Sequence, residues 1–326
     1  MKILITGATG FIGAHLFKAL TAEGYRCRCL VRRVSDVREL EALGAELFFG
    51  DIVERGSLTG AAEGVDIVYH LAAQVGGWGI PEEVFYKVNV TGTVNLLEEA
   101  VRARVKHFIH CSTPGVLGLG KRKAVESLDY NPRGAYERTK CEAERMVLRY
   151  HEMYSLPATV IRPDLVYGPG DLRRAEFFRR IAEKRFIIVG NGKSVLHPTY
   201  VDDLVRGFIL ALPPRRGTNM SIYNIAGPSQ VTVEEFIHTI AECLGVEVPK
   251  LRMPRAIAKL GERAVEMLYK ALERKPPVTS SMIDFLTLDH SSDISKAGRE
   301  LGYIPRISLR DGMKQTIEWY KAQNLL

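Results

Sequence analysis

Long apolar runs are missing from this chain of 326 residues. No stretch approaches the roughly 18 uninterrupted apolar residues that would span a bilayer, so we expect no transmembrane segment. The first strand-like run, residues 2–6, follows Met1 directly and leaves no room for the basic and apolar regions of a secretory signal. The two absences argue against a secreted or membrane-spanning protein, and the cysteine content predicts a cytoplasmic one.

Cysteine is scarce, and its five positions never show the CxxC spacing of zinc ribbons or redox pairs. We therefore expect reduced thiols and no metal site. Cys27 and Cys29 stand two residues apart in a predicted strand, so both side chains face the same way. Packing in a core is the expected role of this pair, rather than metal ligation.

Basic residues outnumber acidic ones, giving a net charge of +7, but no extended basic patch is present. The scattered distribution indicates solvated surface, and no nucleic-acid partner is expected. Some of the basic pairs are alternatively suited to a phosphorylated cofactor or an anionic small-molecule substrate. The clusters are Arg32 with Arg33, residues 121–123, Arg173 with Arg174, Arg179 with Arg180, and Arg215 with Arg216.

Short apolar runs alternate with helical stretches through about residue 165. Such alternation predicts an α/β fold in which helices cover both faces of a doubly wound parallel sheet, the Rossmann arrangement. The expected nucleotide-binding domain spans residues 1–166. Turn signals beyond Gly170 break residues 167–326 into a smaller, partly interleaved substrate domain, with segments around 196–227 returning to the first domain.

An amphipathic helix is expected over residues 256–273, where apolar side chains recur at helical spacing. Packing over a substrate cleft is its expected role, and peripheral contact with a membrane surface or with a partner helix is the alternative. Near the C-terminus, Asp293 is the expected N-cap of one helix and Gly302 its end, and a last helix holds Trp319.

A glycine-rich turn over residues 6–13 lies directly between a predicted strand and a predicted helix, the context of a dinucleotide-binding loop. Glycine permits a tight turn, close approach to a pyrophosphate, and close packing of helix on strand. The helix N-terminus then supplies N–H groups and a favourable dipole. The residues expected to contact the cofactor here are Gly7, Thr9, Gly10, Phe11, Ile12 and Gly13.

The end of the second strand reads Arg32 and Arg33, where enzymes for NAD usually place an acidic residue. Both arginines are suited to the 2′-phosphate of NADP, so NADP is favoured over NAD as the cofactor. Asp51 and Ile52, just after the third strand, are candidates for contact with the adenine edge. A simple turn residue is the alternative role of Asp51.

Tyr136 and Lys140 fall one helical turn apart and so share a helix face. A phenol has an ordinary pKa of about 10, and a nearby ammonium favours the phenolate needed for acid–base chemistry. Ser112 and Thr113 follow the fifth strand, at the edge of the sheet that faces a ligand. A hydroxyl there is expected to orient a substrate oxygen, and turn capping is its alternative role.

These motifs, taken in chain order, resemble the extended short-chain dehydrogenase/reductases of the NAD-dependent epimerase/dehydratase superfamily. The resemblance includes residues 70–73, 162–170, 200–203 and 223–227. It implies that Thr113 or its neighbour Ser112 is the catalytic hydroxyl and that Asn89 organises a water and the backbone near Lys140. It also implies a homodimer through helices around 82–104 and 136–154. The further cofactor contacts that it implies are Leu71, Ala72, Ala73 and Pro163.

Sugar epimerases of this superfamily usually carry an Arg-Asp pair where this chain reads residues 196–199, Leu-His-Pro-Thr. Residues 75–79 with Trp78, the Thr113-Pro114 step and the apolar stretch 253–288 are more similar to 3β-hydroxysteroid dehydrogenases and β-keto lipid reductases. Trp78 is a candidate apolar wall for the substrate, or a side chain packed under a loop.

The expected function is therefore reversible hydride transfer between nicotinamide and a secondary alcohol or ketone on an apolar substrate. A nucleotide-sugar epimerase or dehydratase is the second possibility. In that case Arg173, Arg174, Arg179 or Arg180 would have to bind the sugar nucleotide's phosphates. A noncatalytic dinucleotide-binding sensor is the third, and the presence of both Tyr136 and Lys140 argues against it.

Overall fold

A seven-stranded parallel sheet forms the centre of the protein in a computed structural model, which describes residues 1–326 except 77–78, 213–218, 262–268 and 270–279. Its strand order is β12-β7-β5-β4-β1-β2-β3, and every neighbouring pair runs parallel. The predicted doubly wound α/β fold is confirmed. The strands are β1 (Lys2–Thr6), β2 (Arg26–Val31), β3 (Glu46–Phe49), β4 (Ile67–His70), β5 (His107–Cys111), β7 (Ala158–Pro163) and β12 (Met220–Ile225).

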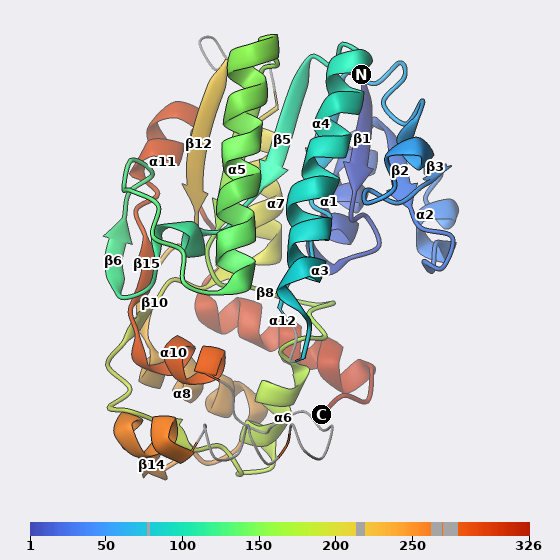
Figure 1. Cartoon of the computed structure of the whole chain (residues 1–326). Helices are drawn as coiled ribbons and strands as arrows, with labels where there is room; N and C mark the ends of the chain where they lie inside the picture. The colour runs from blue at the N-terminus through green and yellow to red at the C-terminus, as the bar shows by residue number, and fades with distance from the viewer. Residues whose placement is uncertain (77–78, 213–218, 262–268, 270–279) are drawn as a thin grey trace.

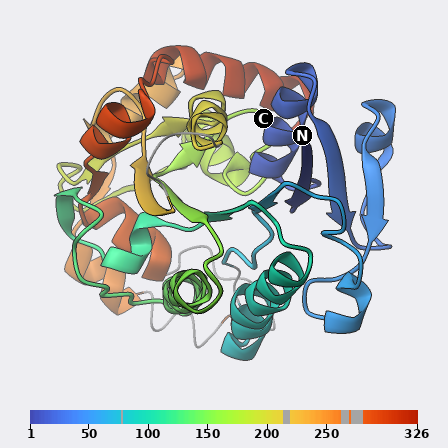
Figure 2. The same cartoon turned by 90° about the horizontal axis from the view of Figure 1, so that it is seen from above.

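Helices cover both faces of this sheet. Seen from above, α4 (Gly92–Arg102) and α5 (Ala135–Tyr154) lie on one side, and α1 (Phe11–Ala22) and α7 (Val201–Leu210) lie on the other (Figure 2). Successive residues of β1 alternate between the two cores, so that Ile3 and Ile5 pack on the α1 side and Leu4 on the opposite side. Burial on both faces explains why β1 and β4 read as nearly continuous apolar runs.

The remaining elements are short. Along the first half they are α2 (Arg38–Ala42), η1 (Arg55–Leu58), α3 (Glu82–Tyr86), the π-helix η2 (Lys87–Thr91), η3 (Pro114–Leu117), β6 (Lys121–Ala124) and β8 (Val166–Tyr167). Later elements are α6 (Ala175–Ala182), β9 (Ile188–Val189), β10 (Val195–Leu196), β11 (Thr199–Tyr200), β13 (Val231–Thr232), α8 (Val233–Leu244), β14 (Arg252–Met253), α10 (Ser280–Thr287), β15 (His290–Ser292), α11 (Ser295–Leu301) and α12 (Leu309–Ala322).

The later part of the chain interleaves with the first part. β12 joins the central sheet beside β7, β11 pairs with β8, and β15 pairs with β6. The arrows of β5 and β12 point toward α8, α10 and α12, so these helices lie beyond the carboxyl ends of the strands (Figure 1). The division expected at residue 166 stays a prediction.

Details of the C-terminal part differ from expectation in one place. Ile294, not Asp293, is the N-cap of α11, although Asp293 Oδ1 still accepts a hydrogen bond from the Ser295 N–H at 2.7 Å. Gly302 ends that helix in the left-handed conformation, as expected, and Trp319 lies in α12. Most of the helix expected over 256–273 lies outside the described residues. In its first turns Ile257 and Leu260 are exposed. Within the described ranges, no helix is both long and apolar enough to cross a membrane.

Candidate active site

The glycine turn joins β1 to α1 with backbones in unusually close contact. Gly7 has φ +75°, and its carbonyl accepts a hydrogen bond from the Gly10 N–H at 3.0 Å. A Cβ on Gly13 would stand 2.0 Å from the Gly7 oxygen, so only glycine allows the approach. Gly10 caps α1 without any side-chain hydrogen bond, and no acidic residue lies in the first turn. The first N–H groups of α1 and its dipole are therefore available to an anion, which fits a dinucleotide pyrophosphate.

The other turn residues lie around this helix start. Thr9 is exposed and lines a hollow of about 580 Å³ together with Asp36 and Arg38. Phe11 and Ile12 are half-buried, and the Phe11 ring meets the His15 ring edge-on at 5.7 Å. The described elements therefore leave space beside the turn on the side of β2.

The expected specificity residues follow β2 directly. Arg32 and Arg33 are exposed, and the Arg33 guanidinium lies 6.0 Å from the centre of the Phe49 ring. Asp36 is a carboxylate that sequence reasoning missed, because it follows β2 by five residues rather than ending it. Its Oδ1 accepts a hydrogen bond from Arg38 Nε at 2.9 Å, and this contact holds the pKa of Asp36 at about 2.

Asp51 and Ile52 occupy different surroundings after β3. The Asp51 carboxylate is half-buried and accepts a hydrogen bond from the Val53 N–H at 3.1 Å, as a turn residue does. Ile52 is buried, and its side chain fills the space where a Cβ of Gly92 would stand. Direct contact of either residue with adenine stays a prediction.

A chain of hydrogen bonds runs from the strand ends toward α5, and sequence reasoning did not find it. The Ala72 N–H donates to Thr6 Oγ1 at 3.2 Å, which lies 2.8 Å from His70 Nδ1. His70 Nε2 lies 2.9 Å from Thr93 Oγ1, and that hydroxyl donates to the Asn89 carbonyl at 2.6 Å. Only the Nε2–H tautomer of His70 satisfies the whole chain. Thr6 and His70 are register partners on β1 and β4, and each stands at the end of its strand.

This chain also fixes the backbone expected to flank the cofactor. A Cβ on Gly7 would stand 2.8 Å from the Ala72 nitrogen, so residues 71–73 pass directly beside the glycine turn. Leu71 and Ala72 are half-buried there, as is Ala73. On the neighbouring β7, Pro163 is half-buried at the end of the strand.

Asn89 joins three segments of the site. Its side chain is 1% exposed, its Oδ1 accepts a hydrogen bond from the Gln74 N–H at 2.8 Å, and its Nδ2 donates to the Gln74 carbonyl at 3.1 Å. Nδ2 also donates to Thr139 Oγ1 at 3.0 Å. Thr139 is the neighbour of Lys140 on α5, so Asn89 ties the loop after β4 to the helix that holds the catalytic candidates. The π-helix turn of η2 carries Asn89 into this position.

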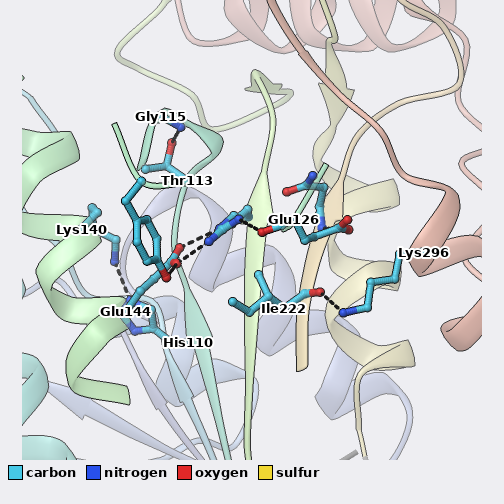
Figure 3. Close-up of polar contacts among 11 residues, drawn as sticks. His110, Thr113, Gly115, Glu126, Lys140, Glu144, Ile222 and Lys296 are labelled. Atoms are coloured by element: carbon cyan, nitrogen blue, oxygen red, sulfur yellow. Dashed lines mark hydrogen bonds and ion pairs between the residues drawn. The ribbon is translucent and has the colours of Figure 1, made fainter. Parts of the chain in front are cut away.

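Lys140 is buried and reaches from α5 to β5. Its Nζ lies 3.1 Å from His110 Nε2, and the side chain is 2% exposed (Figure 3). An ammonium can only donate, so the neutral His110 carries its proton on Nδ1. That Nδ1 is buried with no hydrogen-bond partner in the described part of the chain. His110 therefore acts as an acceptor that fixes the Lys140 ammonium.

Burial dominates the electrostatics of this cluster. It lowers the pKa of Lys140 to about 8 and that of His70 to about 3, and it lowers the pKa of His110 well below its ordinary value. Burial also raises the pKa of Tyr136 above its ordinary value, and the positive charge of Arg173 opposes this rise. The phenolate expected at Tyr136 is thus not the favoured form, because desolvation outweighs the effect of Arg173. Tyr136 is protonated at neutral pH.

Two hydroxyls follow β5, as predicted, and they differ in their hydrogen bonding. Thr113 caps η3, and its Oγ1 accepts a hydrogen bond from the Gly115 N–H at 3.2 Å, which leaves its own proton as a donor (Figure 3). Ser112 is 2% exposed, and its Oγ has no hydrogen-bond partner among the residues described. Thr113 thus combines the capping role with a remaining donor.

Four arginines considered for phosphate binding separate into two groups. Arg174 pairs with Asp171, and Arg179 and Arg180 both pair with Glu176. Arg173 alone among the four has no ion pair or hydrogen bond within the described ranges. Trp78 lies outside the described residues. No group of three or more histidine, cysteine or acidic side chains is suited to a metal ion in the part of the chain that the structure describes.

The parallel sheet, the glycine turn before α1 and the buried Lys140 beside Tyr136 on α5 define a dinucleotide-dependent enzyme of the extended short-chain dehydrogenase/reductase type. The chain belongs to the NAD dependent epimerase/dehydratase family, whose family model matches residues 3–226. It is an enzyme, an oxidoreductase of that superfamily.

Similar proteins cover the whole chain. Sterol demethylase protein B of Methylococcus capsulatus is 30% identical over 100% of this chain and 100% of that protein. A 2-alkyl-3-oxoalkanoate reductase of Stenotrophomonas maltophilia is 28% identical over 97% of this chain and 98% of that protein. The crystal structure of UDP-glucuronic acid 4-epimerase from Bacillus cereus in complex with NAD superposes with a TM-score of 0.78 at 27% identity, covering 99% of each chain.

Proposed function

We propose that this enzyme transfers hydride between a nicotinamide cofactor and a secondary alcohol or ketone on an apolar skeleton. The observation that carries the proposal is the set of Tyr136 and Lys140 on α5 and Thr113 just after β5, with Lys140 buried and Tyr136 and Thr113 half-buried. The relatives named for a sterol and for 3-oxoalkanoates support an apolar substrate with a keto or hydroxyl carbon.

The protein's own groups supply binding and proton transfer. Nicotinamide, when bound, gives or accepts the hydride. Tyr136 is protonated in the absence of ligand, so in ketone reduction its phenol donates the proton to the developing alkoxide oxygen. Thr113 donates a hydrogen bond to the same oxygen. The Lys140 ammonium, fixed by His110, stabilises the negative charge left on the phenol oxygen.

NADP is the cofactor that we favour, with NAD as the alternative. Arg32 and Arg33 are exposed just after β2, in the turn that leads to Asp36 of the hollow that Thr9 lines, and both are suited to a 2′-phosphate. The Asp36 carboxylate in the same hollow favours NAD instead, but Arg38 already neutralises it. Titration of the protein with NADPH and with NADH decides between them, and a clear preference for NADH would overturn this choice.

Replacement of Tyr136 by Phe tests the reaction itself. The variant keeps the half-buried ring but loses the proton donor, so we expect turnover to fall by about 10²-fold or more while the affinity for cofactor stays unchanged. Tyr154→Phe, an exposed tyrosine of the same helix, is the matched control and should behave as the wild type. Nicotinamide absorbance with a panel of sterols, β-hydroxy acids and nucleotide sugars gives the readout. Full turnover by Tyr136→Phe would refute the assignment.

A nucleotide-sugar epimerase is the second candidate, favoured by the similarity to the UDP-glucuronic acid 4-epimerase. His197, in the stretch where the Arg-Asp pair is missing, is buried, and its two ring nitrogens lie 3.1 Å from the Ser292 carbonyl and 2.9 Å from the Gly227 carbonyl, which argues against a phosphate contact there. NAD that stays bound through purification, with epimerisation of a UDP-sugar, would favour this candidate. A homodimer through α4 and α5 remains our expectation, and the mass in solution tests it.

A further inference from the structure

Two buried polar atoms at the end of β5 have no hydrogen-bond partner in the part of the chain that the structure describes. They are His110 Nδ1 and Ser112 Oγ, on side chains that are 0% and 2% exposed. Nearly all buried polar groups in proteins are hydrogen-bonded, because an unpaired one has lost its hydration without compensation. Two such atoms two residues apart indicate a shared partner other than the described side chains.

Both side chains lie on the same face of the sheet. Phe108 packs in the core between the sheet and the helices α4 and α5, and side chains alternate along a strand, so His110 faces α5 as well. Its contact with Lys140 on α5 agrees with this (Figure 3). The Ser112 N–H donates to the Ile161 carbonyl on β7 at 2.7 Å, so the strand geometry continues to Ser112. Ser112 therefore follows His110 on the α5 face, roughly 6–7 Å along the strand, a separation that one bridging water spans.

The polar side chains nearest to this place are already paired. The His70 ring centre lies 5.3 Å from that of His110, but both nitrogens of His70 lie 2.8 and 2.9 Å from threonine hydroxyls. Asn89 donates its two Nδ2 protons to the Gln74 carbonyl and to Thr139 Oγ1. The water that the family resemblance places beside Asn89 therefore finds no N–H of that side chain left to bind it.

The tautomer of His110 decides which contact Lys140 makes. The ammonium only donates, so His110 Nε2 accepts from Lys140 Nζ at 3.1 Å, and the proton of the neutral ring stays on Nδ1. The other tautomer would turn an N–H toward the ammonium. A hydrogen-bond acceptor at Nδ1 favours the first tautomer, and a hydrogen bond to the charged form of Lys140 favours that form. A partner for His110 Nδ1 thus stabilises Lys140 as the ammonium.

We propose that His110 and Ser112 bind one water molecule on the α5 face of β5, and that this water makes His110 a positioning residue for Lys140. The water accepts a hydrogen bond from His110 Nδ1–H and forms another with Ser112 Oγ, so both buried atoms gain a partner. His110 then offers Nε2 to the ammonium and fixes the Lys140 side chain one helical turn from Tyr136. This inference rests on the proposed function, in which the ammonium stabilises the charge left on the Tyr136 oxygen.

A crystal structure that resolves ordered waters tests the site without any substrate. We expect one water within about 3.2 Å of both His110 Nδ1 and Ser112 Oγ. NMR of the protein with 15N-labelled histidine reads the tautomer, because protonated and unprotonated ring nitrogens differ in chemical shift. We expect a neutral His110 with its proton on Nδ1 at neutral pH, assigned by the loss of its signals in His110→Gln. A site without this water, or a proton on Nε2, would overturn the proposal.

The pH dependence of kcat tests the effect on Lys140. Burial lowers the pKa of Lys140 to about 8, so the wild type should lose turnover as the pH rises through about 8 and the ammonium gives up its proton. The other titratable groups around Lys140 are His70, His110, Cys111 and Glu144. Within the described ranges, only His110 accepts a hydrogen bond from Lys140.

His110→Phe removes the acceptor and keeps a ring. We expect the alkaline limb of kcat to move to lower pH by about one unit or more, so that turnover on that side falls about tenfold, while KM changes less than about twofold. His110→Gln, whose amide oxygen takes the place of Nε2, should restore the limb. His238→Gln, at a histidine of α8 with a side chain 41% exposed, is the matched control and should keep the wild-type profile. An unmoved limb in His110→Phe would overturn the positioning role.

Ser112→Ala removes the second anchor of the water and leaves the contact between His110 and Lys140 in place. We expect a smaller shift of the same limb in the same direction, and no further shift when Ser112→Ala is added to His110→Phe, because both residues act through one water. Additive shifts would refute a shared water. If the wild type converts no alcohol or ketone, the proposed function fails, and the crystal structure and the His110 tautomer still decide whether the water site exists.

Discussion

Gly13→Ala places a methyl group into the closest backbone contact at the glycine turn. The new Cβ would stand 2.0 Å from the Gly7 oxygen and 2.7 Å from the Gly7 carbonyl carbon. Ordinary van der Waals contact begins at about 3.4 Å, so α1 and the turn must separate by about 1.4 Å. Both atoms on the far side belong to the backbone, so no side-chain rotation relieves the clash.

The expected cost follows from that separation. Overpacking of this kind costs about 1–3 kcal/mol of folding free energy. The shift also displaces the first N–H groups of α1 from the position that an anion requires. Loss of one charge-assisted hydrogen bond costs about 1.5–3 kcal/mol, which corresponds to cofactor binding weaker by roughly 10-fold to 100-fold.

Calorimetric titration with NADPH and NADH, beside thermal unfolding of the free protein, measures both effects. Gly10→Ala is a graded comparison, since its Cβ would lie 3.2 Å from the Gly7 oxygen, and we expect a smaller loss of affinity. Gly56→Ala, where no atom lies within 4 Å, should leave both properties unchanged. A Gly13→Ala protein that binds the cofactor as tightly as the wild type would refute the assignment of this turn.

Two further predictions concern buried charges. Arg162 is 1% exposed, and its guanidinium donates to both Glu144 oxygens at 2.9 and 2.7 Å. Glu144→Gln leaves this buried positive charge without its negative partner, so urea unfolding should show a free energy of unfolding lower by about 3–5 kcal/mol. Glu142→Gln, which removes one partner of an exposed ion pair, is the control and should change the free energy of unfolding little. An equally small change in both variants would contradict the prediction. Burial raises the pKa of Asp164 to about 7, so its ionisation destabilises the fold as pH rises from about 4 through 7. Asp164→Asn should therefore be more stable than the wild type at pH 8, by up to about 4 kcal/mol, and should lose this advantage near pH 4. If Asp164→Asn were more stable than the wild type by the same amount at every pH, this reasoning would be refuted.

The sheet and the glycine turn were predictable because their signals are local. Parallel strands buried on both faces read as apolar runs, and β1 and β4 follow this pattern. The close approach at Gly13 requires glycine whatever the rest of the fold does. The shared face of Tyr136 and Lys140 follows from helical spacing alone.

Contacts between distant segments depended on the tertiary structure. His110 is on β5 and Lys140 on α5, and no spacing in the chain indicates that their nitrogens lie 3.1 Å apart. Asp36 was missed for a related reason, because only the turn after β2 brings it into the hollow beside Thr9. The protonated state of Tyr136 also depended on the fold, since desolvation is a property of the packed surroundings and not of the residue.

The sequence by itself thus determined the fold class, the position of the dinucleotide turn and the residue types of the acid–base site, because each rests on local patterns of polarity, glycine and spacing. Only the tertiary structure decided which of four candidate arginines forms no ion pair with any residue that the structure describes. Arg174, Arg179 and Arg180 find acidic partners three or four residues away, whereas Arg173 meets the loop of Gly76, nearly a hundred positions earlier in the chain. Long-range packing fixes the environment of each charge, and that environment determines what the charge can bind.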